Sequence, residues 1–285
     1  MKVIRARTAG FCFGVTRAIE IAERAAESGK RPLYTPGPLI HNRQVVDELA
    51  ERGVEVEEDI ARMRPGGTVI VRAHGITAER RREMEAKGLD ILDATCPHVL
   101  QSQERLEEYT RKGFRAVILG DAAHAEVRAL LGYVYTEAVV VASIEEARAV
   151  EFAPPVCVLA QTTFHASLYG RIVDVLRERY ADAVVFDSIC SSTAARQREA
   201  AELARRVEAV VVVGGRHSAN TVRLAEIARE AGVPAFLVEE AAELDLAEMA
   251  CFATVGVTAG ASTPAEAIDG VAAALEALAG EKDNS

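Results

Sequence analysis

The sequence lacks a membrane-spanning segment, because no apolar run reaches the ~18 residues that a membrane helix needs. The first residues, MKVIRARTAGFCFGV, also lack the apolar core of a signal peptide. The formal net charge of −10 argues against non-specific nucleic-acid binding as the main task. None of the glycine-bearing turns forms a GxGxxG or P-loop pattern, so nucleotide binding has little support. We therefore expect a cytoplasmic protein that binds neither nucleic acid nor membranes.

Cysteine is scarce. The 285 residues contain five cysteines, an odd number without a CxxC pair, which does not suit a secreted disulfide framework. Cys157 and Cys251 lie in apolar segments, and we expect both to be buried as small hydrophobic side chains. Cys12, Cys96 and Cys190 differ from them, because each follows an expected strand and precedes an expected helix. They are 84 and 94 residues apart, which indicates an internal repeat.

Polar residues recur with these three cysteines. Histidines follow them after 29, 28 and 27 residues, at His41, His124 and His217. Further polar strand ends come later in each repeat, at His74, Thr162 and Ser262. The repeat predicts three domains of about 90 residues. Their expected ranges are 14–96, 97–190, and 191–280 completed by 1–13, with a tail at 281–285.

Strands rich in valine, isoleucine, leucine and alanine alternate with amphipathic helices, as at 68–75 and 208–220. Such strands indicate parallel sheets covered by helices on both faces. The third repeat lacks its closing strand, and residues 3–10 are the obvious substitute, which would close the repeats into a ring. Ligands bind beyond the carboxyl ends of parallel strands. We therefore expect the repeated cysteines and polar residues to surround one centre.

Three thiols at one centre would bind a metal. The N-terminus of a helix stabilises the negative charge of a thiolate, which is the form that binds metals. The residues alone leave two kinds of site open. One is a zinc site with three cysteines and a histidine or an open position, and the other is an iron–sulfur cluster held by three of its irons. Structural zinc ligands tend to come in CxxC pairs, so such long separations are less usual for zinc.

The sequence resembles the 4-hydroxy-3-methylbut-2-enyl diphosphate reductase (LytB) family over nearly its whole length. The matching motifs are GFCFGVTRAI at 10–19, HNRQVV at 41–46, AHG at 73–75, DATCP at 93–97, HAEV at 124–127, QTT at 161–163, IC at 189–190, RQ at 196–197 and VGVTAGAS at 255–262. The resemblance implies a trefoil of three pseudo-equivalent parallel-sheet α/β domains around a central [4Fe–4S] cluster.

The resemblance also implies an activity. It is the two-electron reductive dehydroxylation of (E)-4-hydroxy-3-methylbut-2-enyl diphosphate to isopentenyl and dimethylallyl diphosphate. This reaction is the last step of the methylerythritol phosphate route to isoprenoids, and its electron donor would be a protein such as ferredoxin or flavodoxin. Loss of a hydroxyl group from carbon needs a nearby acid, and a diphosphate needs several charge-assisted donors.

By the same resemblance, the motifs imply roles for single residues. The cluster would be held by Cys12, Cys96 and Cys190. Glu126 in the HAEV motif would be the proton source, and Thr162 would steady the substrate hydroxyl and its water. The diphosphate would be bound by His41, His74, His124, Ser218, Asn220 and Ser262.

Two alternatives stay open at this point. Ala195, His217 and Ala219 depart from the family pattern, which leaves room for a related reductase of another allylic diphosphate. A non-catalytic iron–sulfur or metal sensor is the second alternative. A sensor needs metal ligands but no proton donor, so the presence of Glu126 and Thr162 argues against it.

Overall fold

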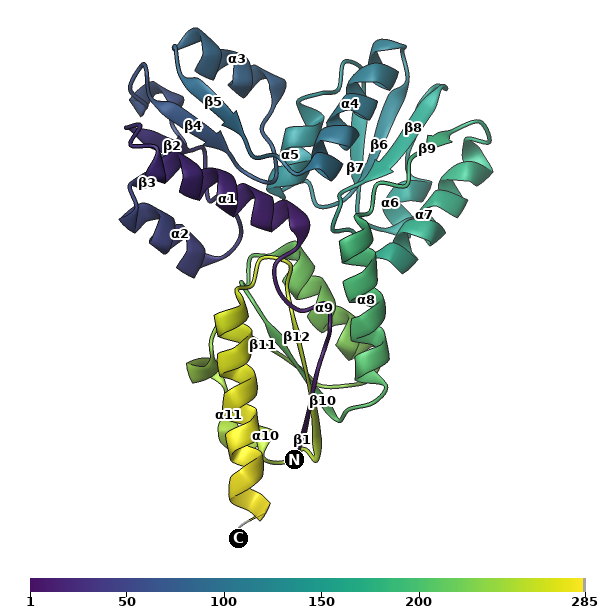
Figure 1. Ribbon diagram of the computed structural model, residues 1–285. Helices are drawn as coiled ribbons and strands as arrows, with labels where there is room; N and C mark the ends of the chain where they lie inside the picture. The colour runs from purple at the N-terminus through teal and green to yellow at the C-terminus, as the bar shows by residue number, and fades with distance from the viewer. Residues whose placement is uncertain (284–285) are drawn as a thin grey trace. The chain divides into compact units, whose positions relative to one another are not determined.

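The valine-rich segments form parallel strands, as a computed structural model of residues 1–283 shows (Figure 1). Within these residues the strands make three four-stranded sheets, and every strand pairing is parallel. The chain divides into two compact units. One unit contains residues 1–13, 41–45 and the chain from 191 onward, and the other contains residues 14–40 and 46–190.

The first sheet follows the N-terminal helix and has the strand order β3-β2-β4-β5. The elements of this part of the chain are α1 (Phe13–Glu27), β2 (Leu33–Thr35), α2 (Arg43–Glu51), β3 (Val54–Val56), the 3₁₀ helix η1 (Ile60–Arg62), β4 (Thr68–Val71), α3 (Ala78–Ala86) and β5 (Asp90–Asp93). The central strand β4 is buried along its whole length. Its residues Val69 and Val71 pack in one cluster with Met84 of α3.

The second sheet repeats this arrangement with the order β7-β6-β8-β9. Its elements are α4 (Pro97–Arg111), β6 (Arg115–Leu119), α5 (Ala125–Leu131), β7 (Ala138–Val141), α6 (Ile144–Arg148), β8 (Val156–Ala160), α7 (Ala166–Arg179) and β9 (Val184–Val185). Successive side chains of a strand point to opposite faces of the sheet. Val117 therefore packs in one buried cluster and Ile118 in another.

The third sheet has the order β11-β10-β12-β1, so the first strand of the chain lies at its edge beside β12 (Figure 1). Its elements are α8 (Ser191–Ala204), β10 (Ala209–Val213), α9 (Ala219–Glu230), β11 (Ala235–Val238), the 3₁₀ helix η2 (Ala241–Glu243), α10 (Leu246–Met249), β12 (Thr254–Ala259), α11 (Ala265–Asp283) and β1 (Lys2–Arg5). Both faces are covered. Val210 packs with Leu224 of α9, whereas Val211 packs with Leu275 of α11.

The three sheets confirm the prediction of three parallel-sheet α/β domains. Strand order is the same in each, and β1 occupies in the third sheet the place that β5 and β9 occupy in the others. The residue ranges given above for the domains stay a prediction. Of the tail expected at 281–285, residues 281–283 continue α11, and residues 284–285 lie outside the described residues. Among residues 1–283, no helix combines the length and the apolarity that crossing a membrane would require.

The two remaining cysteines differ in their surroundings. Cys157 lies in β8 with 1% of its surface exposed, as expected, and burial raises the pKa of its thiol to about 11. The expectation that Cys251 is buried is wrong, because its side chain is exposed. The apolar letters CFATV suggested a strand, but β12 begins only at Thr254. Cys251 instead lies in the turn after α10, where no sheet covers it.

Candidate active site

Each of the three repeat cysteines is fixed by the same backbone contact. Its N–H donates a hydrogen bond to a carbonyl in the polar loop at the end of the neighbouring strand. The bonds join Cys96 to Ala73 at 3.0 Å, Cys190 to Thr162 at 3.0 Å, and Cys12 to Ala261 at 3.1 Å. Ala73 directly precedes His74, and Ala261 directly precedes Ser262. In every sheet, the cysteine and the second polar position predicted from the repeat are therefore held together.

The three cysteines also share their position relative to helices. Cys12, Cys96 and Cys190 immediately precede α1, α4 and α8, which places each thiol at a helix N-terminus. All three are partly buried and form no disulfide. The helix N-terminus favours a negatively charged sulfur. These features suit a metal ligand better than a core side chain.

A buried carboxyl group lies beside the second of these cysteine-bound loops. Glu126 is in the first turn of α5 and only 2% exposed. Its Oε1 accepts the backbone N–H of Thr162 at 2.6 Å, and its Oε2 accepts the Thr162 hydroxyl at 2.8 Å. Burial raises the pKa of Glu126 to about 7, although both bonds from Thr162 act in the opposite direction. The carboxyl group can therefore hold a proton near neutral pH.

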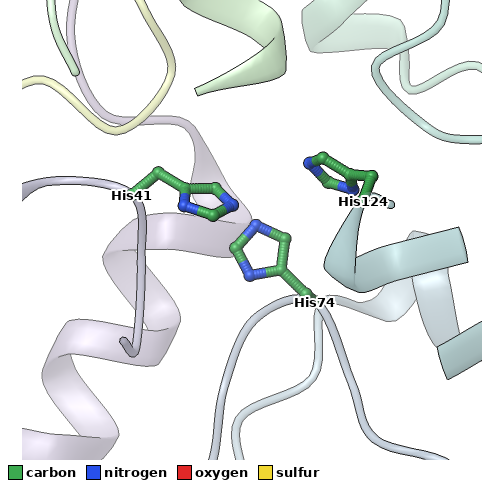
Figure 2. A group of neighbouring side chains, drawn as sticks. All are labelled: His41, His74 and His124. Atoms are coloured by element: carbon green, nitrogen blue, oxygen red, sulfur yellow. The ribbon is translucent and has the colours of Figure 1, made fainter. Parts of the chain in front are cut away.

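Two histidines of this unit lie close together (Figure 2). The rings of His74 and His124 have their centroids 5.5 Å apart at an interplanar angle of 75°. His124 is the N-cap of α5, and its Nδ1 accepts the backbone N–H of Glu126 at 3.2 Å. Because Nδ1 is occupied as an acceptor, Nε2 is the nitrogen left to carry the proton of a neutral ring. The sequence HAEV thus holds an imidazole and an acid at one helix start.

The His74 loop needs its glycine. Gly75 has φ +76°, in the left-handed region that side chains rarely adopt, and a Cβ there would lie 2.6 Å from Nε2 of Gln103. Gln103 is a buried residue of α4 whose Nε2 has no hydrogen-bond partner among residues 1–283. The repeat did not point to Gln103. The one sequence feature that could have identified it is its position in α4, two helical turns after Cys96.

His41 belongs to the other unit, in the segment between β2 and α2. The hydroxyl of Ser262 donates to the carbonyl oxygen of His41 at 3.3 Å. Gly215 also approaches this carbonyl so closely that a Cβ on Gly215 would lie 2.7 Å from the oxygen. The loops after β10 and β12 therefore position the backbone of His41.

The start of α9 in the same unit contains polar atoms that lack partners. Ser218 is the N-cap and accepts the N–H of Thr221 at 3.4 Å. Asn220 is 3% exposed, and neither its Nδ2 nor its Oδ1 has a hydrogen-bond partner within the described residues. Burying an amide without partners costs free energy, so such a group is a sign of a ligand site. Thr221, which the sequence did not single out, is fully buried with its hydroxyl oxygen also unpartnered.

The predicted site residues divide between the two units. Those in the unit of the first two sheets are Cys96, Cys190, Glu126, Thr162, His74 and His124. Those in the other unit are Cys12, His41, Ser218, Asn220 and Ser262. Arg196 of α8 belongs to the RQ motif but was given no role from the sequence, and its buried guanidinium donates to the carbonyl oxygen of Gly10 at 2.5 Å. This bond steadies the segment that leads into Cys12.

These features define an α/β enzyme in which one pattern of polar strand ends occurs three times. A family model described as LytB protein matches residues 3–276. The protein is 43% identical to the 4-hydroxy-3-methylbut-2-enyl diphosphate reductase of Opitutus terrae, over 98% of this chain and 100% of that protein. It is also 43% identical to the enzyme of the same name from Geotalea daltonii, over 99% and 100% of the two chains. The chain belongs to the LytB family.

Solved structures agree with the sequence relatives. The E-1-hydroxy-2-methyl-but-2-enyl-4-diphosphate reductase of Plasmodium falciparum matches with a TM-score of 0.91 and 26% identity, covering 94% of this chain and 86% of that one. A second structure is described as (E)-4-hydroxy-3-methyl-but-2-enyl diphosphate reductase, the terminal enzyme of the non-mevalonate pathway. It matches with a TM-score of 0.69 and 35% identity over 97% and 100% of the two chains.

Proposed function

We propose that this protein reduces (E)-4-hydroxy-3-methylbut-2-enyl diphosphate to isopentenyl and dimethylallyl diphosphate, as the terminal enzyme of the non-mevalonate pathway. Its relatives along the whole chain bear the name of this reductase. In the reaction the allylic C–O bond breaks, and the hydroxyl group takes up a proton and leaves as water. Two electrons and a second proton enter the carbon skeleton, so the reaction consumes two electrons and two protons.

The observation that carries the proposal is the pair formed by Glu126 and Thr162. A hydroxyl is a poor leaving group unless it is protonated as the C–O bond breaks, and a carboxyl group with a pKa of about 7 can supply that proton. Thr162 contacts both carboxyl oxygens and also accepts the N–H of Cys190. Thr162 would therefore hold the acid next to the cysteine loop and orient the substrate hydroxyl.

Membership of the LytB family implies a metal cofactor. We propose that it is a [4Fe–4S] cluster held by Cys12, Cys96 and Cys190. These ligands suit such a cluster, because three partly buried thiols at helix N-termini, none of them in a disulfide, match the thiolates that hold iron–sulfur clusters. When bound, the cluster would supply a Lewis-acidic iron for the hydroxyl oxygen and a path for the electrons.

The diphosphate would be held by the imidazoles of His41, His74 and His124 together with Ser218, Asn220 and Ser262. Imidazole N–H, amide and hydroxyl groups are donors that bind phosphate oxygens. Support comes from the Asn220 amide, which is buried with no hydrogen-bond partner among the described residues. A diphosphate oxygen would accept from its Nδ2 and remove the cost of its burial.

The proposed reaction also requires an electron donor. The reaction consumes two electrons, and one-electron carriers such as ferredoxin or flavodoxin would deliver them in two steps. The proposed location is the cytoplasm, where small soluble carriers of this kind are available.

The direct test is turnover under strict exclusion of oxygen. The protein purified anaerobically with its iron and sulfide should convert the hydroxylated diphosphate into the two isoprenoid diphosphates when a reduced mediator is supplied. Product formation is followed by chromatography, and mediator oxidation should match product at two electrons per molecule. Protein with a full cluster and bound substrate that forms no product would contradict the proposed function.

The pH dependence of turnover follows from the state of Glu126. Because the pKa of this carboxyl is raised from its usual 4.5 to about 7, the group is protonated below that pH and charged above it. We expect kcat to fall about tenfold per pH unit well above neutrality, since only the protonated form donates. The measurement is kcat at saturating substrate between about pH 6 and pH 9. A kcat that rises with pH across this range would contradict the assignment.

A further inference from the structure

A polar cavity of about 240 Å³ lies in the unit of the first two sheets. It is bounded by the loop after β4, the start of α3 and one face of α5. Its charged lining residues are Arg72, Arg80, Arg128 and Glu58, and Gly75 and Thr77 contribute the loop wall. The cavity thus gathers three positive charges and one negative charge.

These arginines are poorly paired. The guanidinium groups of Arg72 and Arg128 form no hydrogen bond or ion pair within residues 1–283, and the Nε atoms of Arg72 and Arg80 are buried without a partner. Arg80 donates through Nη2 to the backbone carbonyl of Glu58 at 2.5 Å. The Glu58 carboxylate attracts Arg72 but forms no ion pair with it. Guanidinium groups can each donate five hydrogen bonds, so most of this donor capacity is unused.

The unpaired charges are unfavourable in the protein alone. Burial and repulsion from Arg128 and Arg80 lower the pKa of Arg72, and attraction to Glu58 opposes this only in part. Arg72 and Arg80 are partly buried, and partial removal of a cation from water without a counter-charge costs free energy that a bound anion would offset. Planar guanidinium groups match the oxygens of a phosphate in pairs, and this makes arginine the preferred partner of such groups.

We propose that the cavity between the β4–α3 loop and α5 binds a phosphate or diphosphate group through Arg72, Arg80 and Arg128, separately from the catalytic site. Its volume is below that of pockets for drug-sized ligands, which limits the occupant to a small anion or the head of a phosphorylated metabolite. This binding site goes beyond the proposed reduction, in which none of the three arginines takes part.

The location of the cavity links it to the site. Arg72 lies two residues before His74, and Arg128 lies one turn after His124 on the helix that His124 caps. The same two segments touch directly, since a Cβ on Gly132 after α5 would collide with Thr77 after the His74 loop. An anion held by Arg72, Arg80 and Arg128 would therefore join the two segments that carry these histidines.

The test is calorimetric titration of the oxidised holoenzyme with inorganic phosphate, and separately with inorganic diphosphate, at constant ionic strength. The catalytic site is first saturated with substrate, without a reductant, so that only a second site is free. We expect saturable binding of one anion. Arg72→Gln and Arg128→Gln should each weaken it by about tenfold or more, since each removes a charge-assisted contact. Arg82→Gln is the matched control, because Arg82 lies on the exposed side of α3 outside the cavity and should leave the affinity unchanged.

Two results would overturn the proposal. One is anion binding that disappears once substrate is bound, because the anion then occupies the catalytic site alone. The other is an equal affinity of the Arg128→Gln and Arg82→Gln variants for the anion. Arg128 is exposed and its side chain makes no hydrogen bond within residues 1–283, so Arg128→Gln should fold and tests the proposal even if Arg72→Gln does not fold. Substrate binding is titrated beforehand, and its failure would count against the reductase proposal rather than against the cavity.

Discussion

Replacement of Glu126 by glutamine should lower kcat by roughly 10²–10⁴-fold, the range typical for loss of a general acid. The substitution removes the acidic proton and little else. In the native protein Thr162 donates to both carboxyl oxygens through its N–H and its hydroxyl. Glutamine can accept the N–H with its Oε1, and its amide can donate to the hydroxyl oxygen once that hydroxyl rotates. Both contacts to Thr162 therefore survive in the variant.

The fold should tolerate this change. Glu126 is 2% exposed, and its charged form is disfavoured by burial. A neutral side chain at pH 7 and above removes that penalty, so the melting temperature should not fall. The native carboxyl stabilises the folded state in its neutral form. That contribution is complete below its ordinary pKa of 4.5 and is lost as the pH rises through about 7. Glu126→Gln should flatten this part of the stability profile.

The measurements for Glu126→Gln are kcat, iron content and substrate affinity on one anaerobic preparation. Iron content and affinity should stay near those of the unmodified protein, whereas turnover should be lost. Glu145→Gln is a suitable control, because Glu145 is an exposed glutamate of α6 outside the proposed site, and this variant should turn over normally. Full activity of Glu126→Gln with an intact metal centre would exclude the acid role.

The fold could be predicted from the sequence because its repeat is carried by local patterns. Apolar strands such as 209–213 are buried on both faces and are recognisable without knowledge of their partners. The regular spacing of the cysteines then predicted that β1 would take the place of a missing last strand, and it pairs with β12. Burial of Cys251 was predicted wrongly for the same reason. A short apolar run looks alike at the start of a strand and in the turn before it.

The sequence predicted which residues belong to the candidate site better than it predicted the contacts between them. Glu126 and Thr162 are 36 residues apart, and no periodic signal specifies that two bonds join them. Asn220 was implied by the family resemblance, but the lack of partners for its amide depends on what packs around the start of α9. Arg72 lies in the loop after β4 and Arg128 lies in α5, and only the packing of that loop against that helix brings them to one cavity. Long-range contacts of this kind depend on tertiary structure, whereas the sequence reports mainly local order.

Serine in place of Cys12, Cys96 or Cys190 should abolish the iron–sulfur chromophore and all turnover. A serine hydroxyl does not ionise near neutral pH and is a harder ligand than a thiolate, so it cannot replace sulfur at iron. Each of these cysteines is fixed by its own backbone N–H, which donates to Ala261, Ala73 or Thr162. The serine variants keep this main-chain bond. We therefore expect folded protein without the cluster, measured by visible absorbance and by iron and sulfide analysis of anaerobic preparations.

The two other cysteines provide the controls that make loss of the chromophore specific. Cys251→Ser changes an exposed thiol, and Cys157→Ala shortens a core side chain whose raised pKa, about 11, keeps it from acting as a thiolate. Both variants should retain iron, sulfide and colour. Retention of the cluster by Cys96→Ser, or stoichiometric zinc without sulfide in the unmodified protein, would refute the assignment. The helix starts and the backbone bonds are alike at all three proposed ligand positions, so loss of any one cysteine should give the same result. A graded series would show that the three sulfurs are not equivalent.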